Sequence, residues 1–470
     1  MKQTFFLFLL YALIGFSCRP KEEQVRTDLP LRLRFSADTI RFDTVLTARA
    51  TVSKRLTVYN PESYGVLIHQ IRLQNEDRQF QLIVDGKPQN VLSNVRLLGK
   101  DSMLIVVQLH LNPTDEKKPF LIENRIEFLT ELHSQFVLIR AYGQNAIYLS
   151  GSKIDTNTVW THHLPYVVLD SVVVEPQAML LIQQGARVFF DKNAYLSVKG
   201  SLQIQGSKDS LVRFLFSRQD ISATGTNFKV AAGQWRGIRL ENQSHHNRLQ
   251  FFQITGATDG LTIFTSDSTL VSHGQIYHCF GRGIYAQKAH LNAFNLAIGN
   301  CSDFAIACQG GNYYFNHVTL GAYIARESQN NQGLGLLLAN FVEKPTDVFP
   351  LRCLLENSVI AGANRNAEYI QIQQQSGADF VFKQSHCVLI SRIASTENSN
   401  LLIHSSNRNT RLADSLFVSP WEMNFRVDTA RNGLLSPLKN KAKLTFVHDD
   451  LDGTLRDSLP DIGAYEWKKI

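Results

Sequence analysis

Four short apolar runs, each opened by an amide side chain, decide the fold of this 470-residue chain: Gln253-Ile254-Thr255-Gly256, Gln275-Ile276-Tyr277-His278, Asn295-Leu296-Ala297-Ile298 and Asn316-His317-Val318-Thr319. Successive runs start 22, 20 and 21 positions apart. An interval this regular is typical of a solenoid, in which each unit buries its apolar face only by stacking on its neighbours. We expect the recurring amides to form a ladder of hydrogen bonds inside the turns.

The turns that follow these runs keep the same interval and carry the charges of the repeat: Asp259-Gly260-Leu261, Arg282-Gly283-Ile284 and Asp303-Phe304-Ala305. A further step of 41 positions leads to Asn357, which fits either two coils or one coil with an insertion. Residues 329–350 interrupt the repeat, and excursions of this kind commonly line a functional groove. Residues 391–412, rich in Ser, Asn and Thr, predict another loop.

The runs are three to five residues long, rich in Ile, Val, Leu and Phe, and separated by Gly, Asn and Ser without long amphipathic helical periods. This pattern indicates coils of parallel β-structure rather than helical repeats. The sequence therefore predicts an all-β protein whose main part is a right-handed parallel β-helix. Such a rod presents a long flat or concave face, which suits the binding or cleavage of extended polymers.

Charge excludes one class of partner. The chain has 48 Lys and Arg against 41 Asp and Glu, a formal net charge of +7. The basic residues are scattered and accompany no nucleic-acid-binding motif, so we expect no nucleic-acid partner. We interpret the charge as a solvated surface; attraction to acidic glycans or lipid head groups is the alternative. The length also exceeds one compact core and predicts at least two folding units.

The segment from residue 31 to 145 alternates polar and apolar residues instead of repeating at a fixed interval. About seven short strand signals over this length fit an immunoglobulin-like β-sandwich. Leu56-Thr57-Val58-Tyr59-Asn60, followed by Pro61 and a turn, resembles the strand that precedes a turn in ASH-type domains. That resemblance implies a spacer or contact surface without catalytic residues.

The N-terminus carries a signal for export. Lys2 supplies a positive charge, Phe5 to Ile14 form an apolar stretch, and Ser17 precedes Cys18. This resembles a bacterial lipoprotein signal, which implies cleavage before Cys18, acylation of Cys18 as the first residue of the mature protein, and so a membrane partner. Lys21-Glu22-Glu23 resembles the signal that directs Bacteroidetes lipoproteins to the cell surface, whereas the alternative is a charged tether over residues 19–30. An ordinary secretory signal is the alternative to lipidation.

Several motifs follow a predicted linker at residues 146–164: Val172-Val173-Val174-Glu175-Pro176, Gln184-Gly185-Ala186-Arg187-Val188-Phe189-Phe190, Gly233-Gln234-Trp235-Arg236-Gly237-Ile238 and Asp461-Ile462-Gly463-Ala464-Tyr465-Glu466. Together they resemble a family of exported Bacteroidetes right-handed β-helix proteins of the pectate-lyase-like superfold. The resemblance implies a β-helix over residues 165–467 with a C-terminal closing segment. It says little about chemistry, because lyases, hydrolases and proteins without known activity share this architecture.

The spacing of the cysteines is compatible with either a disulfide or free buried thiols. Without Cys18, five cysteines remain, and an odd number cannot all pair. Cys279 and Cys301 are 22 positions apart, so they are expected on adjacent coils about 4.8 Å apart, where a disulfide or a ladder of buried thiols is feasible. We favour the thiols. The chain has neither CxxC nor HExxH, so no zinc site is predicted, and a calcium site lacks a cluster of carboxylates.

The turns of the solenoid carry the candidate catalytic residues for cleavage of a polysaccharide. Hydrolysis needs two carboxyl groups that flank the bond, and elimination needs a base and a cation. Asp259, Arg282 and Asp303 occupy equivalent turns of three coils, which would place the two carboxylates about 10 Å apart with the guanidinium between them. We take these as the catalytic candidates. The competing interpretation is a surface ion ladder along stacked turns.

Aromatic side chains offer a second kind of site, because their faces stack on sugar rings. Alternate residues of a strand point inward, so only some of the aromatic residues are available. We select Tyr277, Tyr285 and Tyr313 as candidate platforms.

Two hypotheses follow. The first is a non-catalytic outer-membrane lipoprotein, with the cell surface and the periplasm both open as its location, whose β-helix binds a glycan or an envelope protein. The second is a polysaccharide lyase or glycoside hydrolase that acts on an extended acidic glycan through Asp259, Arg282 and Asp303. We favour the first, and no cofactor is expected.

Overall fold

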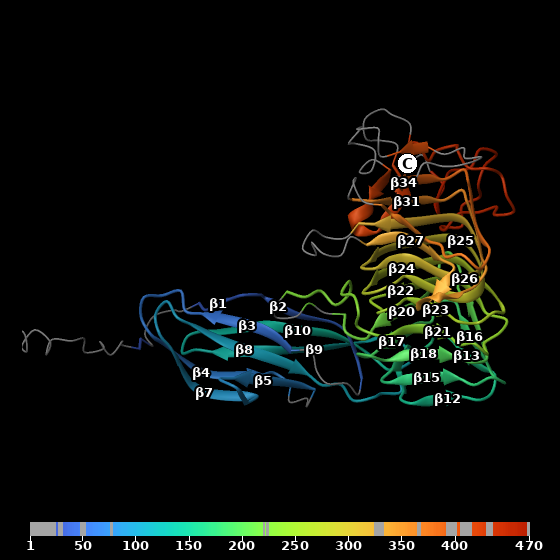
Figure 1. The fold of residues 1–470 in the computed structure, drawn as a ribbon. Coiled ribbons are helices and arrows are strands. Elements are labelled where there is room, and N and C mark those ends of the chain that lie inside the picture. The colour runs from blue at the N-terminus through green and yellow to red at the C-terminus, as the bar shows by residue number, and fades with distance from the viewer. Residues whose placement is uncertain are drawn as a thin grey trace, which may run out of the picture. The chain divides into compact units, whose positions relative to one another are not determined.

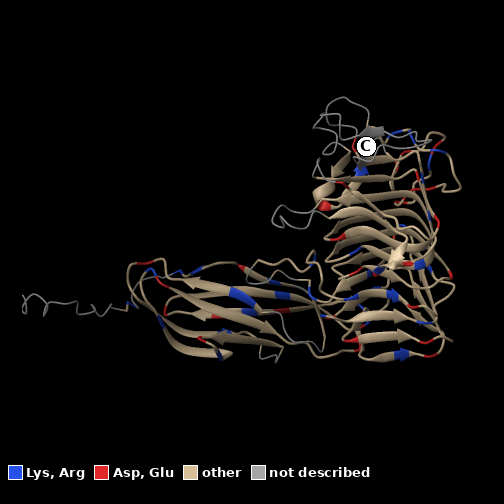
Figure 2. Cartoon of the chain, in the orientation of Figure 1, with Lys and Arg blue, Asp and Glu red and all other residues tan. Residues whose placement is uncertain are grey.

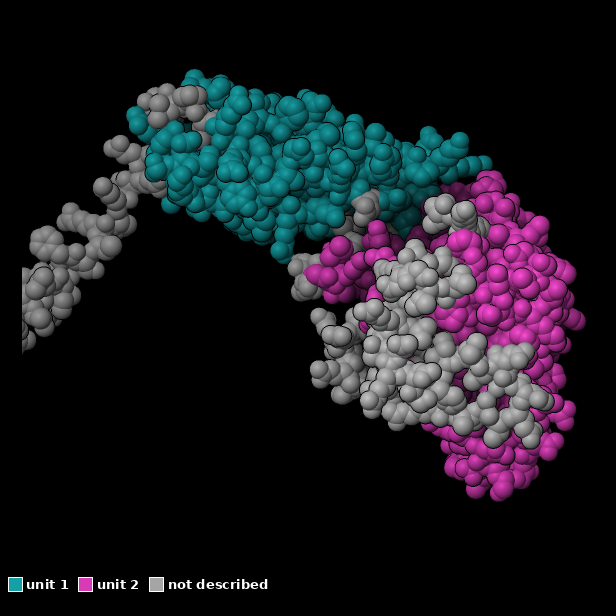
Figure 3. All heavy atoms as spheres, turned by 90° about the horizontal axis from the view of Figure 1, so that it is seen from above, with its two compact units in different colours: residues 1–145 teal, residues 146–470 magenta. Residues whose placement is uncertain are grey.

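The computed structural model describes residues 25–26, 32–47, 53–75, 79–219, 221, 225–323, 333–363, 368–391, 402–404, 416–428 and 436–467. Cys18 and Lys21-Glu22-Glu23 lie outside these residues, as does most of the loop predicted at 391–412. The chain divides into two compact units, Met1–Asn145 and Ala146–Ile470 (Figure 3). In both units Lys and Arg are interspersed with Asp and Glu (Figure 2). Within the described ranges no helix is long and apolar enough to cross a membrane.

The first unit consists of two five-stranded sheets that share one hydrophobic core. One sheet is antiparallel and has the order β1 (Arg34–Phe35), β3 (Ser53–Tyr59), β8 (Ser102–Leu109), β5 (Phe80–Val84) and β6 (Lys87–Pro88). The other has the order β2 (Thr39–Leu46), β10 (Ser134–Gln144), β9 (Phe120–Leu129), β4 (Val66–Leu73) and β7 (Val91–Leu97). Its edge strand β2 runs parallel to β10 and the remaining pairs are antiparallel.

The second unit is a parallel β-solenoid, as the sequence predicts, whose coils stack one above another in Figure 1. Each coil contributes three strands, and strands in the same place of successive coils form a face of the solenoid. The first face contains β11 (Ile147–Leu149), β14 (Tyr166–Val168), β17 (Arg187–Phe190), β20 (Val212–Phe216), the C-terminal parts of β22 (Arg248–Thr255), β24 (Ser268–Cys279), β25 (Ile284–Cys301) and β26 (Phe304–Ala322), then β31 (Val359–Gly362), β34 (Val388–Ser391) and β35 (Leu402–His404).

The second and third faces are built in the same way. The second face contains β12 (Ser152–Ile154), β15 (Ser171–Val174), β18 (Tyr195–Val198), β21 (Gly237–Leu240), β23 (Leu261–Ile263), the beginnings of β25 and β26, β27 (Leu334–Ala339) and β32 (Ile370–Gln373). The third face contains β13 (Thr158–Trp160), β16 (Met179–Gln183), β19 (Ser201–Gln205), the beginnings of β22 and β24, the middles of β25 and β26, β30 (Leu351–Glu356) and β33 (Phe380–Ser385).

In the part of the chain that the structure describes, two antiparallel hairpins lie outside the coils. One consists of β28 (Phe341–Val342) and β29 (Lys344–Val348), and it occupies part of the predicted insertion. The other consists of β36 (Phe417–Ser419) and β37 (Asn424–Val427), joined by the 3₁₀ helix η1 (Pro420–Glu422). Inside the coils, alternate apolar residues form one continuous core along the solenoid. Each fully buried Leu, Ile or Val side chain stabilises the fold by about 2 kcal/mol.

The solenoid differs from the sequence prediction at its start. Residues 146–164 were predicted as a linker, but β11, β12 and β13 pair with β14, β15 and β16 and form the first coil. These three-residue strands are too short for a clear alternation signal. The step of 41 positions is one coil with an insertion, since Asn316 pairs with Glu356 on the adjacent strand.

The register also corrects the predicted ladder of amides. Gln253 pairs with Gln275, and their side chains form a hydrogen bond of 3.2 Å, but Gln275 pairs next with Ala297. Asn295 lies two positions before Ala297, at the corner of the coil, and therefore belongs to a different column. The amides that recur along the sequence therefore do not form one column of the solenoid, because polar residues occur in more than one.

Corners between the third and first faces carry a column of residues with left-handed backbone. We call this set the corner column, and it comprises Phe251, His273, Asn295, His317, Asn357 and His386, with φ values of 48° to 54°. Asn and His tolerate this region better than most residues, because a short polar side chain can bond locally.

The corner column binds the closing segment, residues 436–467. Asn295 donates from Nδ2 to the carbonyl of Asp449 (2.8 Å) and accepts from Nη2 of Arg456 (3.0 Å). Asn357 donates to the carbonyl of Lys443 (2.9 Å) and accepts from its amide (2.8 Å). These bonds join residues 86 to 161 positions apart, so the closing segment links coils that are not adjacent in the stack.

All five cysteines of the second unit are free and buried. Cys279 pairs directly with Cys301 on the adjacent strand. The buried thiols therefore serve as part of the packed interior.

We expect Asn357→Gly to destabilise the solenoid by about 3 kcal/mol, because buried partners of the amide lose their hydrogen bonds. Asn357→Ala should cost about 1 kcal/mol more, because Ala is strained at positive φ. Denaturant unfolding followed by tryptophan fluorescence measures this, since all four Trp residues lie in the second unit. Equal losses for both variants would contradict a backbone contribution.

His317 of the corner column also predicts that the free energy of unfolding depends on pH. Nδ1 of His317 donates to the carbonyl of Gly463, Nε2 accepts from Asn357, and burial lowers the pKa of His317 well below its usual value. Unfolded His takes up a proton near pH 6.5, so this stabilisation is present above pH 6.5 and is lost as the pH falls below it.

The difference in unfolding free energy between wild type and His317→Asn, which retains a residue suited to positive φ, should therefore shrink below pH 6.5. The expected slope is at most about 1.4 kcal/mol per pH unit. Titration of the two proteins side by side measures it, and a difference independent of pH between 7 and 4.5 would refute the assignment.

Candidate functional site

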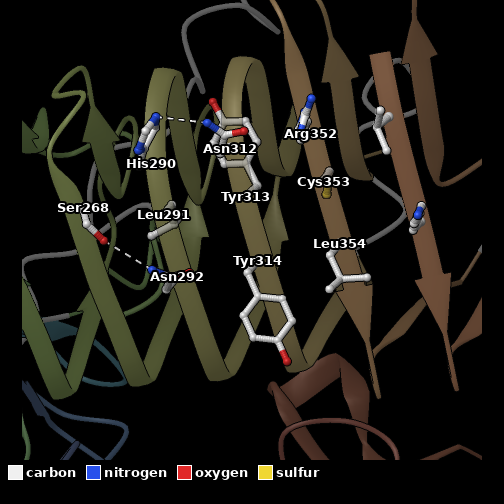
Figure 4. A pocket seen from close by; sticks show the side chains of 12 residues that line it. Ser268, His290, Leu291, Asn292, Asn312, Tyr313, Tyr314, Arg352, Cys353 and Leu354 are labelled. Carbon is white, nitrogen blue, oxygen red and sulfur yellow. Dashed lines mark hydrogen bonds between the residues drawn. The ribbon is translucent and has the colours of Figure 1, made fainter. Parts of the chain in front are cut away.

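The third face of the solenoid carries a groove of about 380 Å³ across β24, β25, β26, β30 and β33 (Figure 4). Strands lie about 4.8 Å apart, so five strands span about 19 Å along the solenoid axis. The polar side chains that line it are Ser268, His290, Asn292, Asn312, Tyr314, Arg352 and Lys383. The groove therefore has the length and polarity of a site for an extended polar ligand.

Alternation along each strand directs these side chains outward. In β25, Leu291 is buried while His290 and Asn292 are exposed. Register then aligns outward residues of neighbouring strands into columns. One column contains His290, Asn312 and Arg352, and a second contains Asn292, Tyr314, Leu354 and Lys383.

Hydrogen bonds hold the polar columns in place. Nδ2 of Asn312 donates to Nε2 of His290 (3.0 Å), which requires an unprotonated nitrogen there. Tyr314 donates its hydroxyl to Glu356 (2.7 Å) and accepts from Nδ2 of Asn316 (2.9 Å). Burial, and then the Glu356 carboxylate, raise the pKa of Tyr314, so the phenol stays protonated.

An aromatic wall borders the groove. Phe446 of the closing segment lies edge-on to Phe294, with ring centroids 5.5 Å apart, and its centroid is 6.1 Å from that of Tyr314. Its side chain is half exposed. Tyr314 and Phe446 thus offer apolar surface beside hydrogen-bonding groups, the combination that sugar rings require.

Positive charge dominates the groove, since among the described residues its lining contains Arg352 and Lys383 and no Asp or Glu. The closest ion-pair partner of Arg352 is Asp379, with Nη2 and Oδ2 3.8 Å apart and side chains 65% and 74% exposed. An exposed pair at this distance contributes little. Arg352 is accordingly available to an anionic ligand.

The structure brings the predicted residues Asp259 and Arg282 together at the entrance to the second face. Arg282 binds the carboxylate of Asp259 through Nε (3.1 Å), Nη2 (3.0 Å) and its backbone amide (2.8 Å). Asp303 is exposed one coil further on; partial desolvation raises its pKa, while Arg282 opposes that effect. Asp259 and Arg282 therefore form one ion pair, in which the carboxylate of Asp259 is already occupied.

The predicted aromatic platforms lie mostly inside the protein. Tyr277 is 7% exposed, and Tyr313 is 4% exposed with its hydroxyl bonded to the carbonyls of Ala286 and Gly310. Tyr285 is half-buried, and the guanidinium of Arg282 covers its ring at 3.9 Å. The outward ring is that of Tyr314, the residue after Tyr313.

The polar side chains that line the groove are not among the predicted sites, because the predicted catalytic residues lie at turns, whereas the groove is built from outward residues of strands. His290 and Asn292 alternate with Leu291 and Ala293, a period-two signal that marks an outward face. The sequence does not show which of Tyr313 and Tyr314 points outward, because a shift of one residue in register moves every side chain of a strand to its other side.

Metal binding has no candidate here. Among the described residues, no group of three or more His, Cys, Asp or Glu side chains is arranged to hold a metal ion.

No family model and no curated protein matches the sequence. Three solved structures show limited likeness. A protein of unknown function from Porphyromonas gingivalis is 14% identical over 26% of this chain and 59% of its own, with a TM-score of 0.18. A family 123 glycoside hydrolase from Clostridium perfringens is 8% identical over 28% of this chain and 31% of its own, with a TM-score of 0.18.

The catalytic unit of a GH87 alpha-1,3-glucanase from Streptomyces thermodiastaticus is 9% identical over 72% of this chain and 75% of its own, with a TM-score of 0.25. The chain thus spans 59% and 31% of the first two of these structures. At such scores none of the three bears on the function of this protein.

Proposed function

We propose that this protein is a cell-envelope lipoprotein that binds an acidic glycan along the third face of its solenoid without cleaving it. The observation that carries the proposal is a groove lined by Arg352, Lys383 and His290 together with amides and a phenol, with no carboxylate in the part of the lining that the structure describes. A guanidinium binds carboxylate or sulfate groups through paired hydrogen bonds, and amides bind hydroxyl groups.

The same lining argues against catalysis in the groove. Glycoside hydrolysis needs two carboxyl groups about 5 to 9.5 Å apart around the bond. Of the carboxylates that contact groove residues, Glu356 accepts a hydrogen bond from Tyr314, and Asp379 forms only the weak exposed pair with Arg352; neither belongs to the lining of the groove. The alternative of a lyase or hydrolase keeps Asp259, Arg282 and Asp303 as its candidates.

The rest of the chain fits a role at the envelope. A lipid on Cys18 would anchor the protein in the outer membrane, and Lys21-Glu22-Glu23 would send it to the cell surface. The first unit, an immunoglobulin-like spacer in this proposal, would separate the solenoid from the membrane.

Binding is expected to depend on the two cations of the groove. Arg352→Ala/Lys383→Ala should weaken binding of acidic polysaccharides at least about tenfold, equivalent to about 1.4 kcal/mol. Its dependence on salt should weaken as well, because fewer charges are paired. Affinity electrophoresis of the mature chain with polygalacturonate, alginate, heparin and neutral dextran measures both effects.

Lys153→Ala/Lys192→Ala is the matched control, because it removes two exposed charges outside the groove and should change nothing. Asp379→Asn, which removes the competing carboxylate, should strengthen binding. If the groove variant binds like wild type, the proposal fails. Unsaturated or reducing ends that appear with wild type and vanish with Arg282→Ala would establish the enzyme instead.

Lipidation is expected to require Cys18. In cells fed radiolabelled palmitate, wild type should incorporate label and sediment with membranes, whereas Cys18→Ser should remain unlabelled. Equal labelling of both proteins would exclude Cys18 as the acylated residue. Proteinase treatment of intact cells separates the two locations, since a protein that stays protected does not face the cell surface.

A further inference from the structure

A second cavity, of about 410 Å³, lies on the first face of the solenoid, on the other side of the corner column from the groove. Strands β22 and β24 form its floor with Gln253, Gln275 and His278. Residues of η1 and β37 border it, together with Tyr465 of the closing segment. We call it the first-face pocket.

Close packing fixes the border of this pocket. Phe425 of β37 lies directly on two glycines of the solenoid, since a Cβ at Gly321 would come within 2.3 Å of its ring and one at Gly299 within 2.7 Å. Arg426 binds Asp452 of the closing segment through Nε and Nη2, both at 3.0 Å. The pocket is therefore formed before any ligand arrives, which lowers the entropic cost of binding.

The described charges around the pocket are balanced in sign. Arg426 is held by Asp452, and Glu422 accepts a hydrogen bond of 3.1 Å from Ser419. Lys229 contributes one exposed ammonium group at the rim. The first-face pocket consequently lacks the excess of positive charge that characterises the groove.

The hydrogen-bonding groups on the pocket floor are uncharged. Nε2 of Gln253 donates to Oε1 of Gln275 (3.2 Å), which leaves Oε1 of Gln253 as an acceptor and Nε2 of Gln275 as a donor. Asn300 donates to Nδ1 of His278, so the proton of the neutral ring is on Nε2. Burial lowers the pKa of His278 to about 4, which keeps the ring neutral at pH 7.

Apolar side chains complete the lining. Leu215, Val230 and Met423 supply apolar surface next to the amides. A small number of neutral donors and acceptors set among apolar groups suits a ring that carries hydroxyl groups on its edge and C–H groups on its face.

We propose that the first-face pocket is a second ligand site, which takes an uncharged polyhydroxyl ring such as a neutral hexose unit. Its residues do not overlap with those of the groove, so this site does not depend on the acidic-glycan function proposed above.

Saturation-transfer NMR of the mature chain with the methyl glycosides of glucose, galactose, mannose and N-acetylglucosamine tests the proposal. At least one should give a signal at millimolar concentration. Gln275→Leu, which keeps the size of the side chain but removes the amide, should reduce that signal at least fivefold. Tryptophan fluorescence of the variant checks that the solenoid is folded.

Arg352→Ala/Lys383→Ala is the discriminating control, and it should leave the neutral-sugar signal unchanged. Absence of signal from all four glycosides would overturn the proposal. So would a signal that survives Gln275→Leu, and so would one that disappears with the groove variant, because the sugar would then bind in the groove. If Gln275→Leu still binds acidic glycans, the acidic-glycan proposal for the groove stands or falls independently of the proposal for the first-face pocket.

Discussion

Strict register between coils is the constraint on which the structure depends. Each strand of the solenoid obtains its hydrogen bonds from the coils before and after it, so corresponding residues must lie one above another. From Phe252 to Gly274 and on to Leu296 and Val318, this register repeats every 22 positions. Corners must then recur at the same place, which requires residues that accept positive φ. His and Asn meet that requirement and also bring hydrogen-bonding side chains.

The corner column turns a local backbone requirement into long-range stabilisation. Because Asn295, His317 and Asn357 point toward the closing segment, each ties residues from the end of the chain to a coil formed much earlier. Arg456 adds a buried ion pair with Glu466, and both side chains are less than one-tenth exposed. A pair this deep needs all its partners, since a single unpaired charge there would be costly. The closing segment thus both completes the fold and borders the two candidate sites.

Register also explains why the two sites differ chemically. On the third face, outward residues of consecutive strands form two adjacent columns, which place cations, amides and an aromatic ring side by side along the groove. On the first face, Arg426 of β37 is paired with Asp452 of the closing segment, and Lys229 and Glu422 carry opposite charges, so the described lining of the first-face pocket has no excess of positive charge. An extended anionic ligand suits the first arrangement and a compact neutral one suits the second.

The sequence by itself determined the class of fold, since strand length, apolar composition and the interval near 21 residues admit a parallel β-solenoid and exclude helical repeats. It also determined that Asp259, Arg282 and Asp303 lie on stacked turns, because they keep that interval. It did not determine which of Tyr313 and Tyr314 faces outward, nor that the first coil begins at Ile147. Both depend on register, and a shift of one residue exchanges the two sides of a strand. No local sequence pattern predicts the first-face pocket, because its lining comes together only when the end of the chain folds back onto the coils, which brings together Leu215, His278, Arg426 and Tyr465. Only the tertiary structure decided that the carboxylate of Asp259 is bound by Arg282, whereas the guanidinium of Arg352 is available to a ligand. Both outcomes depend on distances between side chains, which spacing along the chain does not specify.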